Sequence, residues 1–107
     1  MESLIAEIKG KIDTTPVLIF SKSYCPFCVD AKNIFKSYDV QYSVVELDND
    51  PNGGDIQNGL QSLSGQRTVP NIYIGGHHVG GCDDLKAAVN NGSLKDLLNS
   101  AGVSHGM

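Results

Sequence analysis

Residues 17–28 read Val-Leu-Ile-Phe-Ser-Lys-Ser-Tyr-Cys-Pro-Phe-Cys, an apolar run followed closely by two cysteines. A short apolar run that begins after a proline, here Pro16, is typical of a buried strand. Beyond the cysteines, apolar residues recur at helical spacing, at Ala31, Ile34, Phe35 and Tyr38. We therefore predict a strand followed by a helix, with Cys25 and Cys28 at the junction. Pro26 suits the first helical turn, where its missing N–H has no partner to lose.

The flanking segments extend this unit into a mixed α/β pattern. A second strand over residues 42–47 makes a parallel β-α-β unit with a right-handed crossover, and residues 69–74 and 77–79 predict a hairpin around Gly75-Gly76. Four further helices are expected where apolar residues recur at helical spacing. The first ends at residues 14–16, and the second covers residues 55–64. The third has Asp83 as its N-cap and ends at residues 91–92, and the fourth holds Leu94, Leu97 and Leu98. The expected architecture is one domain over residues 1–107, a four-stranded mixed sheet with helices on both faces. Residues 104–107 are expected to be a frayed tail.

Composition excludes several classes of function. The chain has 107 residues with a formal net charge of −4, which gives no support to nucleic-acid binding. Its longest apolar run, residues 17–20, is too short to cross a membrane, and the N-terminus lacks the pattern of a secretory signal. Three cysteines are an odd number and do not fit an extracellular disulfide scaffold. We expect a cytoplasmic protein that binds neither nucleic acid nor membrane.

Cys25 and Cys28 have the spacing of a redox pair. Side chains at positions i and i+3 of a helix lie on one face, and their Cα separation of roughly 5 to 6 Å suits a disulfide. Cys25 lies at the first free N–H groups, where the positive end of the helix dipole favours a thiolate, and Lys22 adds a nearby cation. Cys28 lies one turn deeper. We predict that Cys25 attacks and Cys28 resolves.

Zinc binding is an alternative interpretation of this pair of cysteines. Cys82 and either His77 or His78 would complete a formal set of four ligands. Against zinc, Pro26 fixes a helix start between the cysteines, and the chain has no second close pair of cysteines. A purely structural disulfide is less favoured still, because cytosolic disulfides are usually catalytic or sensing. The two histidines are expected to be exposed strand residues, and no metal is predicted.

Three motifs together resemble a glutaredoxin over nearly the whole chain. They are Cys25-Pro26-Phe27-Cys28, Thr68-Val69-Pro70 and the run Gly80-Gly81-Cys82-Asp83-Asp84-Leu85. Thioredoxins share the fold but typically carry Trp-Cys-Gly-Pro-Cys, and this chain has no Trp. Dithiol glutaredoxins usually have Tyr where this chain has Phe27, so that position departs mildly from the family pattern.

The resemblance implies a thioredoxin-like fold and a glutathione-dependent thiol–disulfide oxidoreductase. Such an enzyme reduces protein–glutathione mixed disulfides and protein disulfides, here through Cys25 and Cys28. Its reductant is glutathione, which glutathione reductase and NADPH regenerate, and its partners are glutathionylated and disulfide-containing proteins. The resemblance also implies a cis Pro70, with Val69 pairing its backbone with that of the substrate. We expect a monomer.

A glutathione site is expected at the positions that match the family. The helix start at Asp83 would bind the γ-glutamyl carboxylate and Asp84 the ammonium group, while Lys22 and Gln57 would meet the glycyl carboxylate. Phe27 would line the groove, and Arg67 is a further possible cation. The full predicted set is Lys22, Phe27, Gln57, Thr68, Val69, Pro70, Cys82, Asp83 and Asp84.

Two further functions remain open at this stage. Some glutaredoxins hold a [2Fe–2S] cluster between two subunits, through the residue that matches Cys25 and bound glutathione. Those proteins usually lack the proline that matches Pro26. A thioredoxin-type reductase would use the same cysteine chemistry but would accept electrons directly from thioredoxin reductase.

Overall fold

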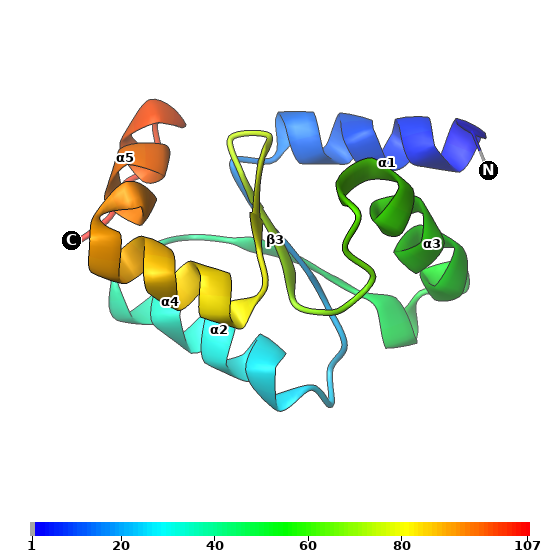
Figure 1. Cartoon of the computed structure of the whole chain (residues 1–107), viewed down its shortest axis with the longest axis horizontal. Coiled ribbons are helices and arrows are strands. Elements are labelled where there is room, and N and C mark those ends of the chain that lie inside the picture. Colours follow the sequence, from blue (N-terminus) through cyan, green and yellow to red (C-terminus); the bar gives the residue numbers. More distant parts are fainter. Residues whose placement is uncertain (1) are drawn as a thin grey trace.

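The computed structural model describes residues 2–107 as a single four-stranded sheet covered by helices (Figure 1). The elements are α1 (Glu2–Thr14), β1 (Val17–Ser21), α2 (Pro26–Ser37), β2 (Ser43–Glu46), the 3-10 helix η1 (Leu47–Asn49), α3 (Gly53–Ser64), β3 (Asn71–Ile74), β4 (His77–Gly80), α4 (Cys82–Asn91) and α5 (Ser93–Ser100). None of the helices in these residues is long and apolar enough to cross a membrane.

The sheet has the order β2-β1-β3-β4. β1 is parallel to β2 and antiparallel to β3, and β3 forms an antiparallel hairpin with β4. All five residues of β1 are buried, as expected for a central strand that is covered on both faces. The predicted mixed sheet and its strand order along the chain are therefore confirmed.

Alternate residues of β1 face opposite sides of the sheet and belong to two apolar clusters. Val17 and Ile19 pack with Phe35 of α2 and with apolar residues of α4 and α5. Leu18 and Phe20 pack instead with apolar residues of α1 and α3. Figure 1 shows the same division, with α1 and α3 on one side of the strands and α2 and α4 on the other. β1 thus ends between two packed layers, and the segment that follows it is held at the edge of the sheet.

The start of α4 differs from the sequence prediction. Asp83 is not the N-cap, because the helix begins at Cys82 and is capped by Gly81. The Asp84 carboxylate reaches back and accepts a hydrogen bond of 2.9 Å from the Gly81 N–H. Gly80, with a φ of 116°, makes room for this contact, since a Cβ there would overlap the Asp84 carboxylate. Two carboxylates therefore lie in the first helical turn, where the dipole favours them.

The prediction of a frayed tail over residues 104–107 is wrong. The Gly106 N–H donates a hydrogen bond of 2.7 Å to the carbonyl of Tyr38, the residue that caps α2. Met107 packs against the apolar cluster that contains Phe35. The reason is that a helix end leaves carbonyl groups without partners, and the C-terminal segment supplies a donor for one of them.

Candidate redox site

Cys25 is the N-cap of α2, and Pro26 is the first residue of the helix, as the sequence predicts. The Cys25 carbonyl accepts the first helical hydrogen bond, 3.1 Å from the Val29 N–H. Because Pro26 has no N–H, the unpaired donors of the first turn belong to the next two residues. The Cys25 sulfur is half-buried and lies 3.9 Å from the carbonyl oxygen of Val69, which brings together two segments far apart in the sequence.

Cys28 has the opposite environment, although it lies only one turn further along α2. It is fully buried, and it and Cys25 are both free thiols. Burial raises the pKa of the Cys28 thiol above its ordinary value, against the smaller opposing effects of hydrogen bonds from the Lys22 backbone and the Ser21 hydroxyl. At neutral pH Cys28 is therefore a protonated, shielded thiol next to an accessible one.

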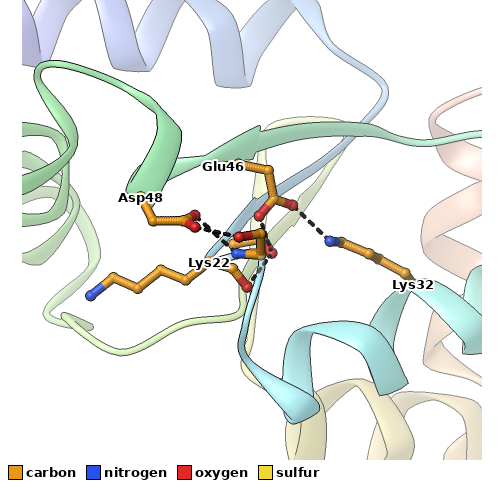
Figure 2. A network of polar contacts seen from close by, with 6 residues as sticks. Lys22, Lys32, Glu46 and Asp48 are labelled. Atoms are coloured by element: carbon orange, nitrogen blue, oxygen red, sulfur yellow. Dashed lines mark hydrogen bonds and ion pairs between the residues drawn. The ribbon is translucent and has the colours of Figure 1, made fainter.

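Carboxylates on β2 and η1 anchor the segment before Cys25 (Figure 2). Glu46 accepts a hydrogen bond of 3.2 Å from the buried Ser21 hydroxyl and forms a 2.7 Å ion pair with Lys32 of α2. Asp48 accepts hydrogen bonds from both the N–H and the hydroxyl of Ser23. The Lys22 side chain extends away from these contacts in Figure 2, and its ammonium forms no ion pair with any of the side chains described, those of residues 3–107.

The Asp48 contacts predict a pH-dependent stability. The Ser23 donors lower the pKa of Asp48, so the carboxylate stabilises the fold above the ordinary carboxyl pKa of about 3.9 and loses this effect as the pH falls through the lowered value. Asp48→Asn should lower the melting temperature modestly at pH 7, because the group is exposed to solvent. The difference in melting temperature between Asp48→Asn and wild type should become smaller as the pH falls.

Melting temperatures measured from pH 7 to pH 2 test this prediction. The exposed Asp30 supplies the control, since Asp30→Asn should leave the melting temperature nearly unchanged at every pH. A gap between Asp48→Asn and wild type that stays constant with pH would show that the carboxylate charge is not what stabilises this segment.

A groove of about 370 Å³ lies beside the cysteines. Its lining joins the first residues of α2 to the loop before β3 and the start of α4: Phe27, Gln66, Thr68, Val69, Pro70, Gly81, Cys82, Asp83 and Asp84. Phe27 is 60% exposed, so it forms a wall of the groove rather than part of the core. The Val69–Pro70 peptide bond is cis, as predicted. Most of the predicted glutathione-binding set is therefore gathered around one groove.

Lys22 and Gln57 do not line this groove. The Gln57 side-chain amide donates a hydrogen bond of 2.7 Å to the carbonyl of Arg67, and the Arg67 guanidinium donates to the Asn58 side chain. Gln57 and Arg67 thus join α3 to the loop before β3. In this structure Gln57 supports that loop, and its amide nitrogen already has a partner.

Cys82 is buried although it lines the groove, with an exposed fraction of 5%. Burial raises the pKa of its thiol, and Lys86 opposes this only in part. A thiol that stays protonated is a weak nucleophile, so Cys82 is a poor candidate for the attacking sulfur. Among the side chains of residues 3–107, no group of three or more His, Cys, Asp or Glu residues is arranged to hold a metal ion, so the zinc set considered above is not assembled.

Sequence reasoning missed Gln66, which lines the groove and supports its backbone. The Gln66 side-chain amide donates hydrogen bonds of 3.0 Å to the Thr68 carbonyl and 2.9 Å to the Pro70 carbonyl. The only available signal was its position, since an amide just before a proline turn is well placed to satisfy the carbonyls of that turn.

Comparisons with known proteins agree with this geometry. Residues 17–79 match the family model described as Glutaredoxin. The chain is 45% identical over 99 residues to Glutaredoxin-C6 of Oryza sativa subsp. japonica, which covers 92% of this chain and 88% of that protein. It superposes on the crystal structure of a wheat glutaredoxin with a TM-score of 0.89 and 44% identity, over 94% of this chain and 93% of that one. A buckwheat glutaredoxin–glutathione complex gives a TM-score of 0.91 and 36% identity, over 94% of this chain and 92% of that one.

Proposed function

Because the chain belongs to the glutaredoxin family, we propose that Cys25 and Cys28 are the redox pair through which it performs thiol–disulfide exchange. It is a glutathione-dependent thiol–disulfide oxidoreductase with a thioredoxin-like fold. One observation carries the assignment of roles within the pair. The Cys25 sulfur lies at the start of α2, 3.9 Å from Val69 of the groove, while Cys28 is fully buried.

In the one-cysteine route, the Cys25 thiolate attacks the glutathione sulfur of a protein–glutathione mixed disulfide. The sulfur–sulfur bond of the substrate breaks, the protein thiolate leaves and takes up a proton, and Cys25 becomes bonded to glutathione. A second glutathione thiolate then attacks the glutathione sulfur of this adduct, which forms glutathione disulfide and restores Cys25. Glutathione reductase and NADPH return the disulfide to two glutathione molecules.

In the two-cysteine route, Cys25 first forms a mixed disulfide with a protein substrate. Cys28 then loses its proton and attacks the Cys25 sulfur, so that the reduced protein leaves and the Cys25–Cys28 disulfide forms. Two glutathione molecules reduce this disulfide in turn. The raised pKa of Cys28 supports this order, because a buried thiol that holds its proton does not compete with Cys25 for the first attack.

Glutathione binds in the groove beside Phe27 in this proposal. The unpaired N–H groups at the start of α4 bind the γ-glutamyl carboxylate, and the Asp84 carboxylate binds the ammonium group. The Val69 backbone pairs with the cysteinyl backbone of the ligand. Lys22 supplies a charge for the glycyl carboxylate from outside the groove. The Thr68, Pro70, Cys82 and Asp83 side chains complete the walls.

We further propose that the enzyme acts as a monomer in the cytoplasm, where the glutathione pool keeps thiols reduced. Its substrates there are glutathionylated and disulfide-containing proteins, and glutathione reductase and NADPH supply the electrons. Sedimentation of the reduced protein and subcellular fractionation test these two statements separately.

Asp84→Asn should weaken glutathione recognition without disturbing the fold. The amide oxygen of the variant still accepts the hydrogen bond from the Gly81 N–H, so α4 keeps its start. The charge for the ligand ammonium is lost, which costs about 1 to 2 kcal/mol, or about 5- to 30-fold in kcat/KM for a glutathione mixed disulfide. A small disulfide without the γ-glutamyl group should be reduced as in wild type.

The control for this variant is Asp96→Asn, which makes the same change in the first turn of α5, on an exposed residue outside the groove. It should leave both substrates unaffected. If Asp84→Asn slowed both disulfides equally, Asp84 would be a structural residue and its assignment to the ammonium group would be wrong.

A coupled assay tests the proposed function as a whole. The purified protein is mixed with glutathione, glutathione reductase, NADPH and a small glutathione mixed disulfide, and NADPH absorbance is followed. Consumption of NADPH should rise in proportion to the amount of protein added. A parallel assay with thioredoxin reductase in place of glutathione should show no turnover. Turnover only in the second assay would assign the chain to the thioredoxin type of reaction.

A further inference from the structure

We propose that His78 of β4 is a positioning residue for the groove, and that it acts as a hydrogen-bond donor through Nε2 to Gln66 and Asn71. The sequence gives His78 only as an exposed strand residue. The hydrogen bonds are a property of the fold, whereas their consequence for turnover rests on the proposed function.

The direction of these hydrogen bonds follows from the two amides. Gln66 uses its amide nitrogen to donate to the Thr68 and Pro70 carbonyls, so its oxygen is the atom that faces His78, with Oε1 3.0 Å from Nε2. The reverse orientation would place the amide oxygen against two carbonyl oxygens. Two lone pairs would then meet without a proton between them, which is unfavourable.

Asn71 leads to the same conclusion independently. Its side chain is fully buried, and its amide nitrogen donates a hydrogen bond of 3.4 Å to the backbone carbonyl of Gln66. The Asn71 Oδ1 therefore also faces the His78 Nε2, at 3.0 Å. Buried amide oxygens are nearly always hydrogen-bonded, and His78 is the donor this one has.

A nitrogen that faces two acceptors must carry a proton. A neutral imidazole has one N–H, and the two contacts require it to lie on Nε2, which shares it in a three-centre hydrogen bond. The centroids of the His78 and Tyr73 rings lie 5.1 Å apart. Partial burial lowers the pKa of His78, and the negative charge of Asp84 opposes this shift. The neutral Nε2–H tautomer therefore holds both amides at neutral pH.

The position of His78 is set by the pairing of the hairpin formed by β3 and β4. Next to the turn, His77 pairs with Ile74 and His78 pairs with Tyr73, and the register of β3 with β4 shifts only beyond this point, between Tyr73 and Ile72. His77 is exposed, as His78 is, but its side chain makes no hydrogen bond among residues 3–107, whose side chains the structure describes. Two adjacent histidines thus offer a matched comparison, because only one of them is tied to the groove.

Through Gln66, His78 fixes the loop that presents Val69. Gln66 holds the carbonyls of Thr68 and Pro70, the residues on either side of Val69, and leaves the Val69 carbonyl to face the Cys25 sulfur. If His78 no longer orients the Gln66 oxygen, the amide can rotate and both carbonyls can move. We expect the loss to affect binding of the disulfide substrate more than the chemistry at Cys25.

The tautomer is tested by long-range ¹⁵N–¹H correlation spectra of the reduced full-length protein at neutral pH. His78 should show a protonated Nε2 and an unprotonated Nδ1, while His77 should show exchange-averaged nitrogens. A protonated Nδ1 or averaged nitrogens at His78 would overturn the proposal. The measurement needs no substrate, so it stays decisive even if the proposed function were wrong.

The effect on turnover is tested with His78→Leu, His78→Gln and the control His77→Leu. His78→Leu should raise KM for a glutathione mixed disulfide about 5- to 10-fold, as expected for the loss of about one hydrogen bond, with kcat changed far less. His78→Gln keeps a donor and should recover most of the loss, and His77→Leu should match wild type. If His78→Leu lowered only the melting temperature or kcat, with KM unchanged, His78 would be merely structural. A wild-type protein without any turnover would instead contradict the proposed function.

Discussion

Cys25→Ser should reduce turnover of glutathione mixed disulfides to the uncatalysed background. In both proposed routes, the atom that bonds to the substrate is the Cys25 sulfur, which is half-buried at the start of α2. A serine hydroxyl at the same position is a far weaker nucleophile and cannot take part in disulfide exchange. The fold should persist, because Cys25 forms no disulfide and belongs to neither apolar cluster.

The coupled assay measures this loss, with thermal unfolding of the same sample as the check on folding. Cys28→Ser is the matched comparison, since it makes the same chemical change one helical turn away. Residual turnover in a folded Cys25→Ser variant, well above the rate without protein, would mean that another sulfur attacks the substrate.

Cys28→Ser should preserve the one-cysteine route and abolish the two-cysteine route. It should retain reduction of glutathione mixed disulfides, because a second glutathione molecule replaces the resolving thiol. It should lose formation of the intramolecular disulfide completely, and with it the two-cysteine reduction of protein disulfides. The fully buried position of Cys28 supports this division, since external substrates do not reach its sulfur.

Both activities can be followed on one preparation of the variant, the first in the coupled assay and the second with a disulfide-containing protein substrate. Loss of both activities in a folded Cys28→Ser variant would show that resolution within the protein is obligatory. Retention of both would show that Cys28 takes no part in turnover.

The junction of β1 and α2 was predictable because its signals are local. An apolar run, a proline at the first helical position and apolar residues at helical spacing each depend on a few neighbouring residues. The same holds for the order of the strands along the chain. Local signals also place the two cysteines one turn apart on one helix, which is the basis of the redox assignment.

The start of α4 shows where local signals are insufficient. Asp83 has the right chemistry for an N-cap, yet the cap is Gly81, two residues earlier, and the helix begins at Cys82. The positive φ of Gly80 and the contact from Asp84 back to the Gly81 N–H determine that start. Cap chemistry alone pointed to Asp83, whereas the backbone geometry places the cap at Gly81.

The support of the groove was not predictable because it depends on contacts between distant segments. His78 of β4 reaches Gln66 in the loop before β3 and Asn71 of β3, residues that lie seven or more positions earlier in the sequence. The prediction for residues 104–107 was wrong for a similar reason, because the Gly106 N–H donates a hydrogen bond to the carbonyl of Tyr38 at the end of α2. Composition and periodicity carry no information on such pairings.

The central claim is that Cys25 is the sulfur that exchanges with glutathione, and mapping the adduct tests it most directly. The Cys28→Ser variant, which keeps Cys25 and Cys82, is incubated with glutathione disulfide and analysed by intact mass and by peptide mapping without reductant. Cys82 is buried and its thiol pKa is raised, whereas the Cys25 sulfur is half-buried at a helix start. We predict one glutathionyl group per molecule, on the peptide that contains Cys25. Attachment to Cys82 instead, or no adduct at all in the folded protein, would contradict the claim.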